Sequence, residues 1–171
     1  MLKNLFLKKT YSLCILLLIT LIGYNSYGQT LTISNSGETG TSGTNWSILG
    51  SVLEATENAS IHPTVIERAL DLGDFSIQVN GEKGTIVIQS PVRSFKSNPL
   101  KLIAQSSIQV YEPVEISGGE IYFSVSDTHA ARGSIFVNSE ISVVSASGQG
   151  GDILLEAKDI TLSEKAKLLA S

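Results

Sequence analysis

The sequence is short of cysteine and histidine. Cys14 is the only cysteine and lies inside an apolar N-terminal segment, whereas a lipoprotein cysteine would follow such a segment. The rest of the chain therefore has no disulfide, no thiol nucleophile and no cysteine ligand for a metal. The two histidines, His62 and His129, are far apart in sequence, and neither is followed by a metal ligand at zinc-motif spacing. Two such histidines make a poor zinc site, so both are expected at the surface.

Positive charge is also scarce. Three of the 12 Lys and Arg residues fall within residues 1–28 and none of the 16 Asp and Glu residues do, which leaves residues 29–171 with 9 basic and 16 acidic side chains and a net charge of −7. This balance argues against nucleic acid or anionic lipid as the main partner. The polar residues are mostly Ser, Thr, Gly and Asn and aromatic residues are few, which is typical of secreted β-rich repeat proteins.

Residues 1–28 are predicted to be a signal peptide. Lysines 3, 8 and 9 form a positive start, and the apolar run from Leu13 to Ile22 is shorter than the ~20 residues that a membrane-spanning helix needs. Ser26 and Gly28 place small residues at the positions that a signal peptidase reads, which predicts cleavage before Gln29. The alternative is a retained membrane anchor.

The clearest pattern is a repeat in the C-terminal part, where three blocks each hold three short runs of alternating apolar and polar residues. The apolar positions are Leu100, Leu102, Ala104, Ile108, Val110, Val114 and Ile116 in the first block, Ile121, Phe123, Val125, Ile135, Val137, Ile141 and Val143 in the second, and Ile153, Leu155, Ala157, Ile160, Leu162, Ala166 and Leu168 in the third. Steps of 27 and 25 residues separate Ile108, Ile135 and Ile160, and the same steps separate Ile116, Val143 and Leu168. Repeats of this length are typical of stacked solenoids.

Alternation places every second side chain of a strand on the same face. Three strands a turn, each with an inward apolar row, predict coils with an apolar interior, stacked through parallel pairing. An earlier coil is expected from Asp74 onward, and residues 91–99 and 126–132 are expected to be loops that leave the coils. An antiparallel sandwich of short strands is the alternative. The pattern stops in mid-repeat at Ser171, so the chain is expected to be truncated, as the N-terminal piece of a longer protein.

The region before the repeats is expected to cap the N-terminal end of the stack. Residues 30–33 are predicted as a strand, residues 35–45 as a loop, and residues 46–53 as two strands joined by a turn at Gly50 and Ser51. A helix is predicted over residues 60–73, with Pro63 in its first turn and Gly73 at its end. Trp46 is expected to cover the open end of the stack. The predicted organisation is a signal peptide over 1–28, a cap region with a short helix over 29–73, and coils over 74–171.

The segment 150–162, which starts Gly-Gly-Asp-Ile and continues as two alternating strands, resembles the repeat unit of filamentous-haemagglutinin-like large exoproteins, and residues 117–123 are a weaker copy. Residues 55–61, together with the helix and the residues after it, resemble the start of repetitive surface adhesins of the Bacteroidetes type. The resemblance covers about residues 46–171. It implies an all-β, right-handed parallel β-helix, a secreted or cell-surface location, and adhesion.

No residue is assigned a catalytic, cofactor-binding or metal-binding role. Residues 148–152 resemble one copy of a calcium-binding glycine-rich repeat, but that site needs several adjacent copies, so a turn is expected there. The leading hypothesis is a noncatalytic exported solenoid of an adhesin or large exoprotein. Its expected partners are glycans or other cell-surface molecules and further repeats of the same polypeptide, with no nucleic acid and no stable membrane span after signal cleavage.

Two alternatives stay open. One is a purely structural stalk. The other is a polysaccharide-processing β-helix enzyme, because hydrolysis of a glycoside needs two carboxylates held roughly 5 to 10 Å apart. The candidate acids are Asp152, Glu156, Asp159 and Glu120.

Overall fold

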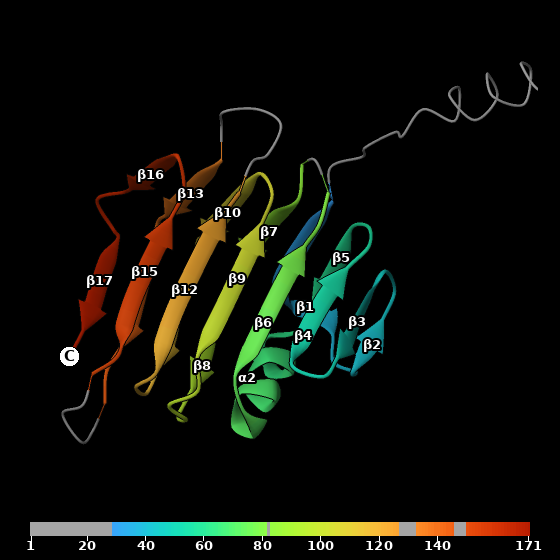
Figure 1. Ribbon diagram of the computed structural model, residues 1–171, viewed down its shortest axis with the longest axis horizontal. Helices are drawn as coiled ribbons and strands as arrows, with labels where there is room; N and C mark the ends of the chain where they lie inside the picture. The colour runs from blue at the N-terminus through green and yellow to red at the C-terminus, as the bar shows by residue number, and fades with distance from the viewer. Residues whose placement is uncertain (1–28, 82, 127–132, 146–149) are drawn as a thin grey trace, which may run out of the picture.

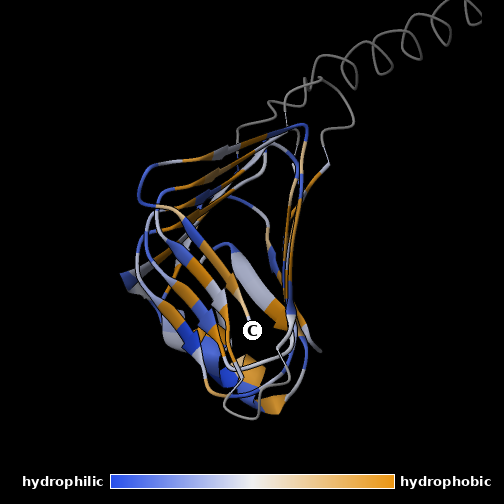
Figure 2. Ribbon diagram, turned by 90° about the vertical axis from the view of Figure 1, so that its left-hand side faces the viewer, coloured by the Kyte–Doolittle hydropathy of each residue, from blue (hydrophilic) through white to orange (hydrophobic). Residues whose placement is uncertain are grey.

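A computed structural model describes residues 29–81, 83–126, 133–145 and 150–171. The chain forms a β-solenoid of about five turns with parallel sheets, seen from the side in Figure 1 and from one end as a three-sided coil in Figure 2. The predicted all-β parallel solenoid with a short N-terminal helix is therefore confirmed, and the antiparallel sandwich is excluded.

Each complete coil contributes one strand to each of three sheets. The strands of the last four coils are, in chain order, β6 (Phe75–Val79), β7 (Thr85–Ile88) and β8 (Val92–Ser94); β9 (Leu100–Ala104), β10 (Ser107–Val110) and β11 (Val114–Ile116); β12 (Glu120–Val125), β13 (Ser134–Val137) and β14 (Glu140–Val143); and β15 (Asp152–Glu156), β16 (Asp159–Leu162) and β17 (Lys167–Ala170). Five further strands precede these, namely β1 (Thr30–Glu38), β2 (Ser42–Gly43), β3 (Trp46–Leu49), β4 (Val52–Ala55) and β5 (Ala59–Ile61). Sheet A has the order β16-β13-β10-β7-β1-β5, sheet B β15-β12-β9-β6-β4-β3-β2, and sheet C β17-β14-β11-β8.

The inward side chains form the apolar ladders that the repeat predicts. Ile86, Ile108, Ile135 and Ile160 lie opposite one another in sheet A, and the first three are fully buried. Their neighbours along each strand point outward and are half-buried. Because each buried side chain of this ladder has an apolar partner on the strands before and after it, the core runs along the solenoid rather than filling one centre.

The first coil replaces its third strand with a helix. It consists of β4 (Val52–Ala55), β5 (Ala59–Ile61) and α2 (Pro63–Leu72). The His62 side chain accepts the backbone N–H of Thr64 as the helix N-cap, Pro63 begins the first turn, and Gly73 ends the helix. The predicted helix is confirmed with slightly shorter bounds, and Pro63, Val65, Ile66 and Leu70 are its buried residues.

The remaining N-terminal strands are β1 (Thr30–Glu38), β2 (Ser42–Gly43) and β3 (Trp46–Leu49). β3 and β4 form the predicted antiparallel pair, with Gly50 in the turn at φ 63°. Trp46 is buried on β3. β1 inserts in parallel between β5 and β7 in sheet A, whereas β4 and β6 of the same coils pair directly in sheet B.

Two expectations about loops are wrong. Residues 91–99 are not all a loop, because β8 pairs with β11 through Val92 and Ser94; its inward position at Ser94 is polar, so the apolar alternation does not reveal it. The expected loop over residues 35–45 is also partly paired, since β1 continues to Glu38 and β2 pairs with β3. The loop expected over 126–132 falls almost wholly outside the described residues.

The last coil is shifted by two residues on its third side. Leu168 lies opposite Ile141, and Ala170 lies opposite Val143, whereas the repeat predicted Leu168 opposite Val143. Four residues, 163–166, join β16 to β17, but only two, 138–139, join β13 to β14. The longer turn therefore moves the strand along its sheet, and it places Ala166 in the turn.

Candidate functional site

The outer face of sheet A carries a row of small hydroxyl side chains. Thr30, Thr85, Ser107 and Ser134 lie opposite one another on successive strands, and Asp159 continues the row. Neighbouring strands of a sheet are ~4.8 Å apart, so the hydroxyl groups are evenly spaced along the solenoid. One pair is hydrogen-bonded, with Ser107 Oγ donating to Thr85 Oγ1 at 3.2 Å. The row is a flat array of groups that both donate and accept hydrogen bonds.

A second outward row on the same face includes an aromatic pair. Gln109 lies opposite Phe136 in this row, and Phe136 contacts Tyr111, which follows β10, with ring centroids 5.8 Å apart and planes tilted by 56°. The Tyr111 hydroxyl donates to Gln109 Oε1 at 3.1 Å, and 41% of Tyr111 is exposed. The contact and the hydrogen bond fix a partly exposed aromatic surface beside the hydroxyl row.

At the N-terminal end of sheet A, a bulge in β1 opens a groove of about 470 Å³. Both Ile33 and Glu38 lie opposite Ile61, so residues 34–37 of β1 bulge out of the pairing with β5. Gly37 permits this close return, because a Cβ there would lie 2.1 Å from the Ile61 carbonyl carbon. The polar side chains that line the groove are Thr30, Thr32, Ser36, Glu38, Thr44, Asn58 and Ser60. We call this hollow the β1 groove.

One side-chain donor and one backbone donor hold the Glu38 carboxylate in the β1 groove. Its Oε2 accepts from the indole Nε1 of Trp46 at 2.5 Å and from the backbone N–H of Thr44 at 2.8 Å. The Trp46 hydrogen bond lowers the pKa of Glu38 from its usual 4.5. Burial opposes this shift, whereas the hydroxyl and the backbone N–H of Thr44 add to it. The carboxylate is therefore ionised at neutral pH, and Oε1 has no hydrogen-bond partner among the residues described.

A second groove, of about 740 Å³, runs across the stacked turns between sheets C and B, and we call it the turn groove. Gly119, at φ 84°, and Gly151 belong to these turns, and a Cβ on Gly151 would lie 1.4 Å from the Gly119 carbonyl oxygen. The close stacking of turns therefore requires the glycines before β12 and β15. Exposed Phe95 lines the groove, together with Glu120 and Asp152.

Only two of the four candidate acids lie on neighbouring strands in the same groove. Glu120 and Asp152 lie opposite each other on β12 and β15 and both line the turn groove. Glu156 lies at the other end of β15, where its carboxylate accepts a hydrogen bond from the Tyr122 hydroxyl, and Asp159 begins β16 in another sheet. The four side chains therefore do not form one cluster.

The third hollow, of about 480 Å³, lies between α2 and the β3–β4 turn and is mostly apolar. Val65, Ala69 and Leu72 of the helix face Ile48 and Phe75 across it. Leu72 is almost fully exposed, but its neighbours belong to the packed cap.

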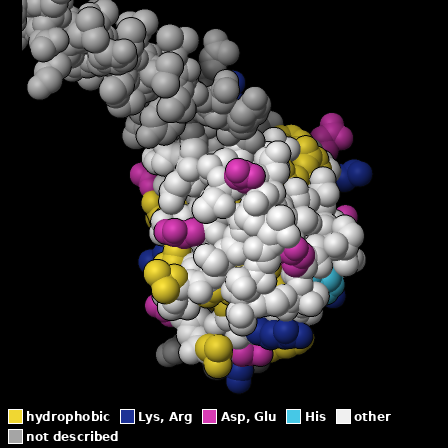
Figure 3. Space-filling view, turned by 90° about the vertical axis from the view of Figure 1, so that its right-hand side faces the viewer, with side chains coloured by type: hydrophobic (Ala, Val, Ile, Leu, Met, Phe, Trp, Pro, Cys, Tyr) yellow, Lys and Arg dark blue, Asp and Glu magenta, His cyan; other side chains and the backbone are white. Residues whose placement is uncertain are grey.

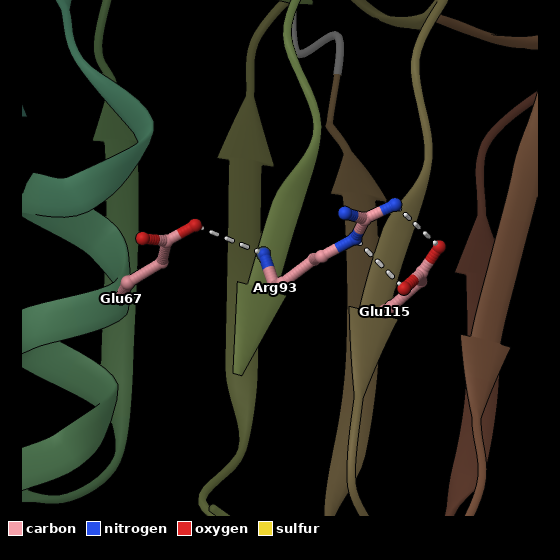
Figure 4. A network of polar contacts seen from close by, with 3 residues as sticks. All are labelled: Glu67, Arg93 and Glu115. Carbon is pink, nitrogen blue, oxygen red and sulfur yellow. Dashed lines mark hydrogen bonds and ion pairs between the residues drawn. The ribbon is translucent and has the colours of Figure 1, made fainter. Parts of the chain in front are cut away.

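On sheet C, charged side chains connect the helix to the solenoid (Figure 4). Glu67 of α2 accepts the backbone N–H of Arg93 on the edge strand β8 at 3.3 Å, and the Arg93 guanidinium pairs with Glu115 of the next coil at 2.9 Å. The first contact satisfies a donor that the edge of the sheet would otherwise expose. All three groups thus have structural partners.

The remaining candidates have structural roles or fall outside the description. His62 is the helix N-cap, Gly150 and Gly151 form part of a stacked turn, and Asp152 begins β15. His129, residues 148–149 and residues 1–28, which are predicted to be a signal peptide, lie outside the described residues. In the part of the chain that is described, no group of three or more His, Cys, Asp or Glu residues is arranged to hold a metal. No helix among those residues has the length and apolarity to cross a membrane.

Sequence reasoning missed the β1 groove and the aromatic pair. The groove depends on a bulge whose two ends meet the same residue, Ile61, and no local pattern indicates that. The sequence pattern predicts that Gln109 and Phe136 point outward. It does not predict that Tyr111 contacts Phe136, because the position of Tyr111 depends on the conformation of the turn after β10.

Comparisons with known proteins give no relative: no protein-family model, no curated protein and no solved structure matches this chain.

Proposed function

We propose that this chain is a noncatalytic, exported β-solenoid segment of a cell-surface adhesin or large exoprotein, and that it binds glycans through the outer face of sheet A. The observation that carries the proposal is the Tyr111–Phe136 pair beside the hydroxyl row. Aromatic faces pack against the apolar C–H faces of sugars, while hydroxyl and amide groups bond to sugar hydroxyls.

The charge of this face also favours a neutral ligand. Among the side chains of the two outward rows, Asp159 is the only charged one in the described strands. A nucleic acid or an anionic lipid surface would require basic side chains, and the chain has a net negative charge. A flat, repetitive polar surface with Asp159 as its one charged side chain suits an extended polysaccharide, because stacked coils offer hydroxyl groups again at each step.

The test is retention of the full chain on immobilised neutral plant, algal and host polysaccharides. A double variant, Tyr111→Ala with Phe136→Ala, should lose retention. Phe95→Ala removes an aromatic side chain that is 87% exposed in the turn groove and serves as the matched control. Retention that depends on Phe95 instead of the pair would move the site to the turn groove, and no retention at all would reject binding in favour of a structural stalk.

One observation favours the enzyme alternative. Glu120 and Asp152 lie on neighbouring strands and line one groove, and two nearby carboxylates are the group that glycoside hydrolysis uses. New reducing ends or unsaturated products from the same polysaccharides, abolished by Glu120→Gln or Asp152→Asn, would replace the adhesin with an enzyme. Glu156→Gln is the control, because Glu156 lies at the opposite end of β15.

We further propose export through cleavage of residues 1–28 and contact with further repeats of the same polypeptide. Support for the second comes from Ile160, Leu162 and Leu168, inward side chains of the last coil that are 41–50% exposed and that another coil would bury. N-terminal sequencing of the exported protein should read Gln29 first, and a sequence beginning at Met1 would reject signal cleavage.

A further inference from the structure

The β1 groove contains an acceptor that the fold does not use. Glu38 Oε2 is held by two N–H donors, and these contacts orient the whole carboxylate, since its two oxygens are rigidly joined. Oε1 is left without a hydrogen-bond partner within the described part of the chain, in a groove whose other polar groups are hydroxyls and one amide. Such a fixed, ionised acceptor forms hydrogen bonds roughly twice as strong as neutral ones.

The hydroxyl groups around this carboxylate are also partly fixed. Ser34 Oγ lies 3.2 Å from Ser60 Oγ and 3.1 Å from Ser36 Oγ, so the bulge and β5 are connected through a chain of hydroxyls. The Asn58 side chain accepts the backbone N–H of Thr30 at 2.9 Å, which fixes the end of the groove. A ligand therefore meets groups that already have defined positions, and less ordering free energy is lost on binding.

The chemistry of the groove selects one ligand class. A calcium ion takes six to eight oxygen ligands, usually from several carboxylates, whereas this groove has one carboxylate, already bonded to two donors. An uncharged polyol needs one strong acceptor and several groups that both donate and accept hydrogen bonds, which is the composition found here.

We propose that the β1 groove binds a terminal, uncharged sugar unit of a glycan, with Glu38 Oε1 accepting hydrogen bonds from its hydroxyl groups and Thr32 and Ser60 contacting the same unit. The proposal rests on the glycan-binding function above and gives it a specific site. Thr30 belongs both to this groove and to the hydroxyl row. A bound glycan chain can therefore continue from the groove along the outer face of sheet A.

The test uses the single tryptophan of the chain. The Trp46 indole N–H donates to Glu38, and Trp46 is 3% exposed, so its N–H resonance reports changes at the carboxylate without direct contact with a ligand. The isotope-labelled full chain is titrated with the methyl glycosides of glucose, galactose and mannose. We expect at least one of them to shift the indole resonance saturably, together with the amides of Thr32, Gly37 and Ser60.

Three variants define the site. Glu38→Gln keeps an oxygen for the Trp46 and Thr44 donors but places an NH₂ group where Oε1 lies, so it should weaken binding by roughly tenfold or more, as expected for a lost charge-assisted hydrogen bond. Thr32→Val removes one hydroxyl at constant shape and should weaken binding by roughly three- to tenfold. Glu54→Gln changes an exposed glutamate on the neighbouring strand β4 and should bind as the unaltered chain does. A cooperative thermal transition well above the assay temperature would show that each variant folds.

The outcomes separate this proposal from the broader one. Retention on polysaccharides that is unaffected by Glu38→Gln and Thr32→Val would overturn the groove site and leave the glycan-binding face intact. A chain that binds no saccharide in either assay would reject both. A response of the Trp46 resonance to calcium chloride or choline chloride, with none to the methyl glycosides, would assign the groove to a cation and reject the sugar.

Discussion

Inward apolar side chains are fully buried at the N-terminal end of the solenoid but partly exposed in the last coil, although both ends have the same alternating residue pattern. At the N-terminal end, β2 and β3 extend sheet B beyond the first coil, in which α2 forms the third side, and inward Leu53, Ile61 and Ile66 are fully buried. Most of the surface there consists of uncharged polar side chains and backbone (Figure 3). In the last coil, Ile160 and Leu162 occupy the ladder positions of Ile135 and Val137 but are 44% and 50% exposed. Burial of an inward solenoid side chain therefore depends on having other parts of the chain packed against it on both sides, and the sequence pattern alone does not determine it.

The largest effect is expected from two single variants that each place an aspartate in the same ladder, one at a buried position and one at a partly exposed position. Ile135→Asp puts an unpaired carboxylate between two coils and should lower the free energy of unfolding by more than ~4 kcal/mol. Ile160→Asp leaves its carboxylate in contact with water and should lower it by about 1 kcal/mol. Urea unfolding of the purified chain measures both.

Ser134→Asn is the matched control for this pair, because Ser134 precedes Ile135 and points outward. It should change the unfolding free energy by less than about 0.5 kcal/mol. Equal losses for Ile135→Asp and Ile160→Asp would show that the last coil is as well covered as the middle ones.

The second expected effect compares two glycines with positive φ. Gly119→Ala strains a residue at φ 84° and drives a Cβ to 2.6 Å from the Ser97 carbonyl oxygen, so it should cost roughly 3 kcal/mol. Gly50→Ala, in the β3–β4 turn at φ 63° with no atom within 4 Å of the new Cβ, should cost only the backbone strain of about 1 kcal/mol. Thermal unfolding measures the difference, and equal losses would contradict the close stacking of the turns.

A third effect concerns how the helix is attached to the N-terminal end. The Asn98 side chain donates to the Leu70 carbonyl oxygen at 2.6 Å, and this bond joins the end of α2 to the turn before β9. Asn98→Ala should lower the free energy of unfolding by about 1 kcal/mol. Asn80→Ala, in an exposed turn, should change it by less than about 0.5 kcal/mol. Equal effects would mean that the bond adds nothing to the cap.

The smallest effect is a dependence on pH. Because the folded pKa of Glu38 is lowered below its usual 4.5, mainly by the Trp46 hydrogen bond, its ionised form stabilises the cap above pH 4.5. This contribution is lost as the pH falls through the folded pKa. Glu38→Gln should therefore reduce the fall in melting temperature between neutral pH and a pH well below 4.5. An identical fall in both proteins would show that Glu38 takes no part in the acid sensitivity.

The ladders could be predicted because the alternation of apolar residues directly encodes which side of a strand is buried. Ile108 and Ile135 follow that rule. The helix that begins at Pro63 and the turn at Gly50 were predictable for a different reason, because proline and glycine mark helix ends and turns locally. β8 could not be found this way, since its second inward residue is Ser94, and the position of Leu168 could not, since two extra turn residues shift the strand without changing its pattern. The β1 groove requires the pairing of Glu38 with Ile61, a contact between segments that no local pattern connects.

The insertion of β1 has a consequence for the order in which the chain can fold. Leu31 pairs with Ala59 on one side and Thr30 pairs with Thr85 on the other, so the first strand to be synthesised needs partners made 28 and 55 residues later. The first separation is similar to that between neighbouring coils, such as the 27 residues from Ile108 to Ile135. The second is about twice as long, and contacts of longer sequence separation form more slowly. Coils further along can nucleate on their neighbours as they emerge. We therefore expect β1 to pair first with β5, and its pairing with β7 to be a later step in the folding of this end.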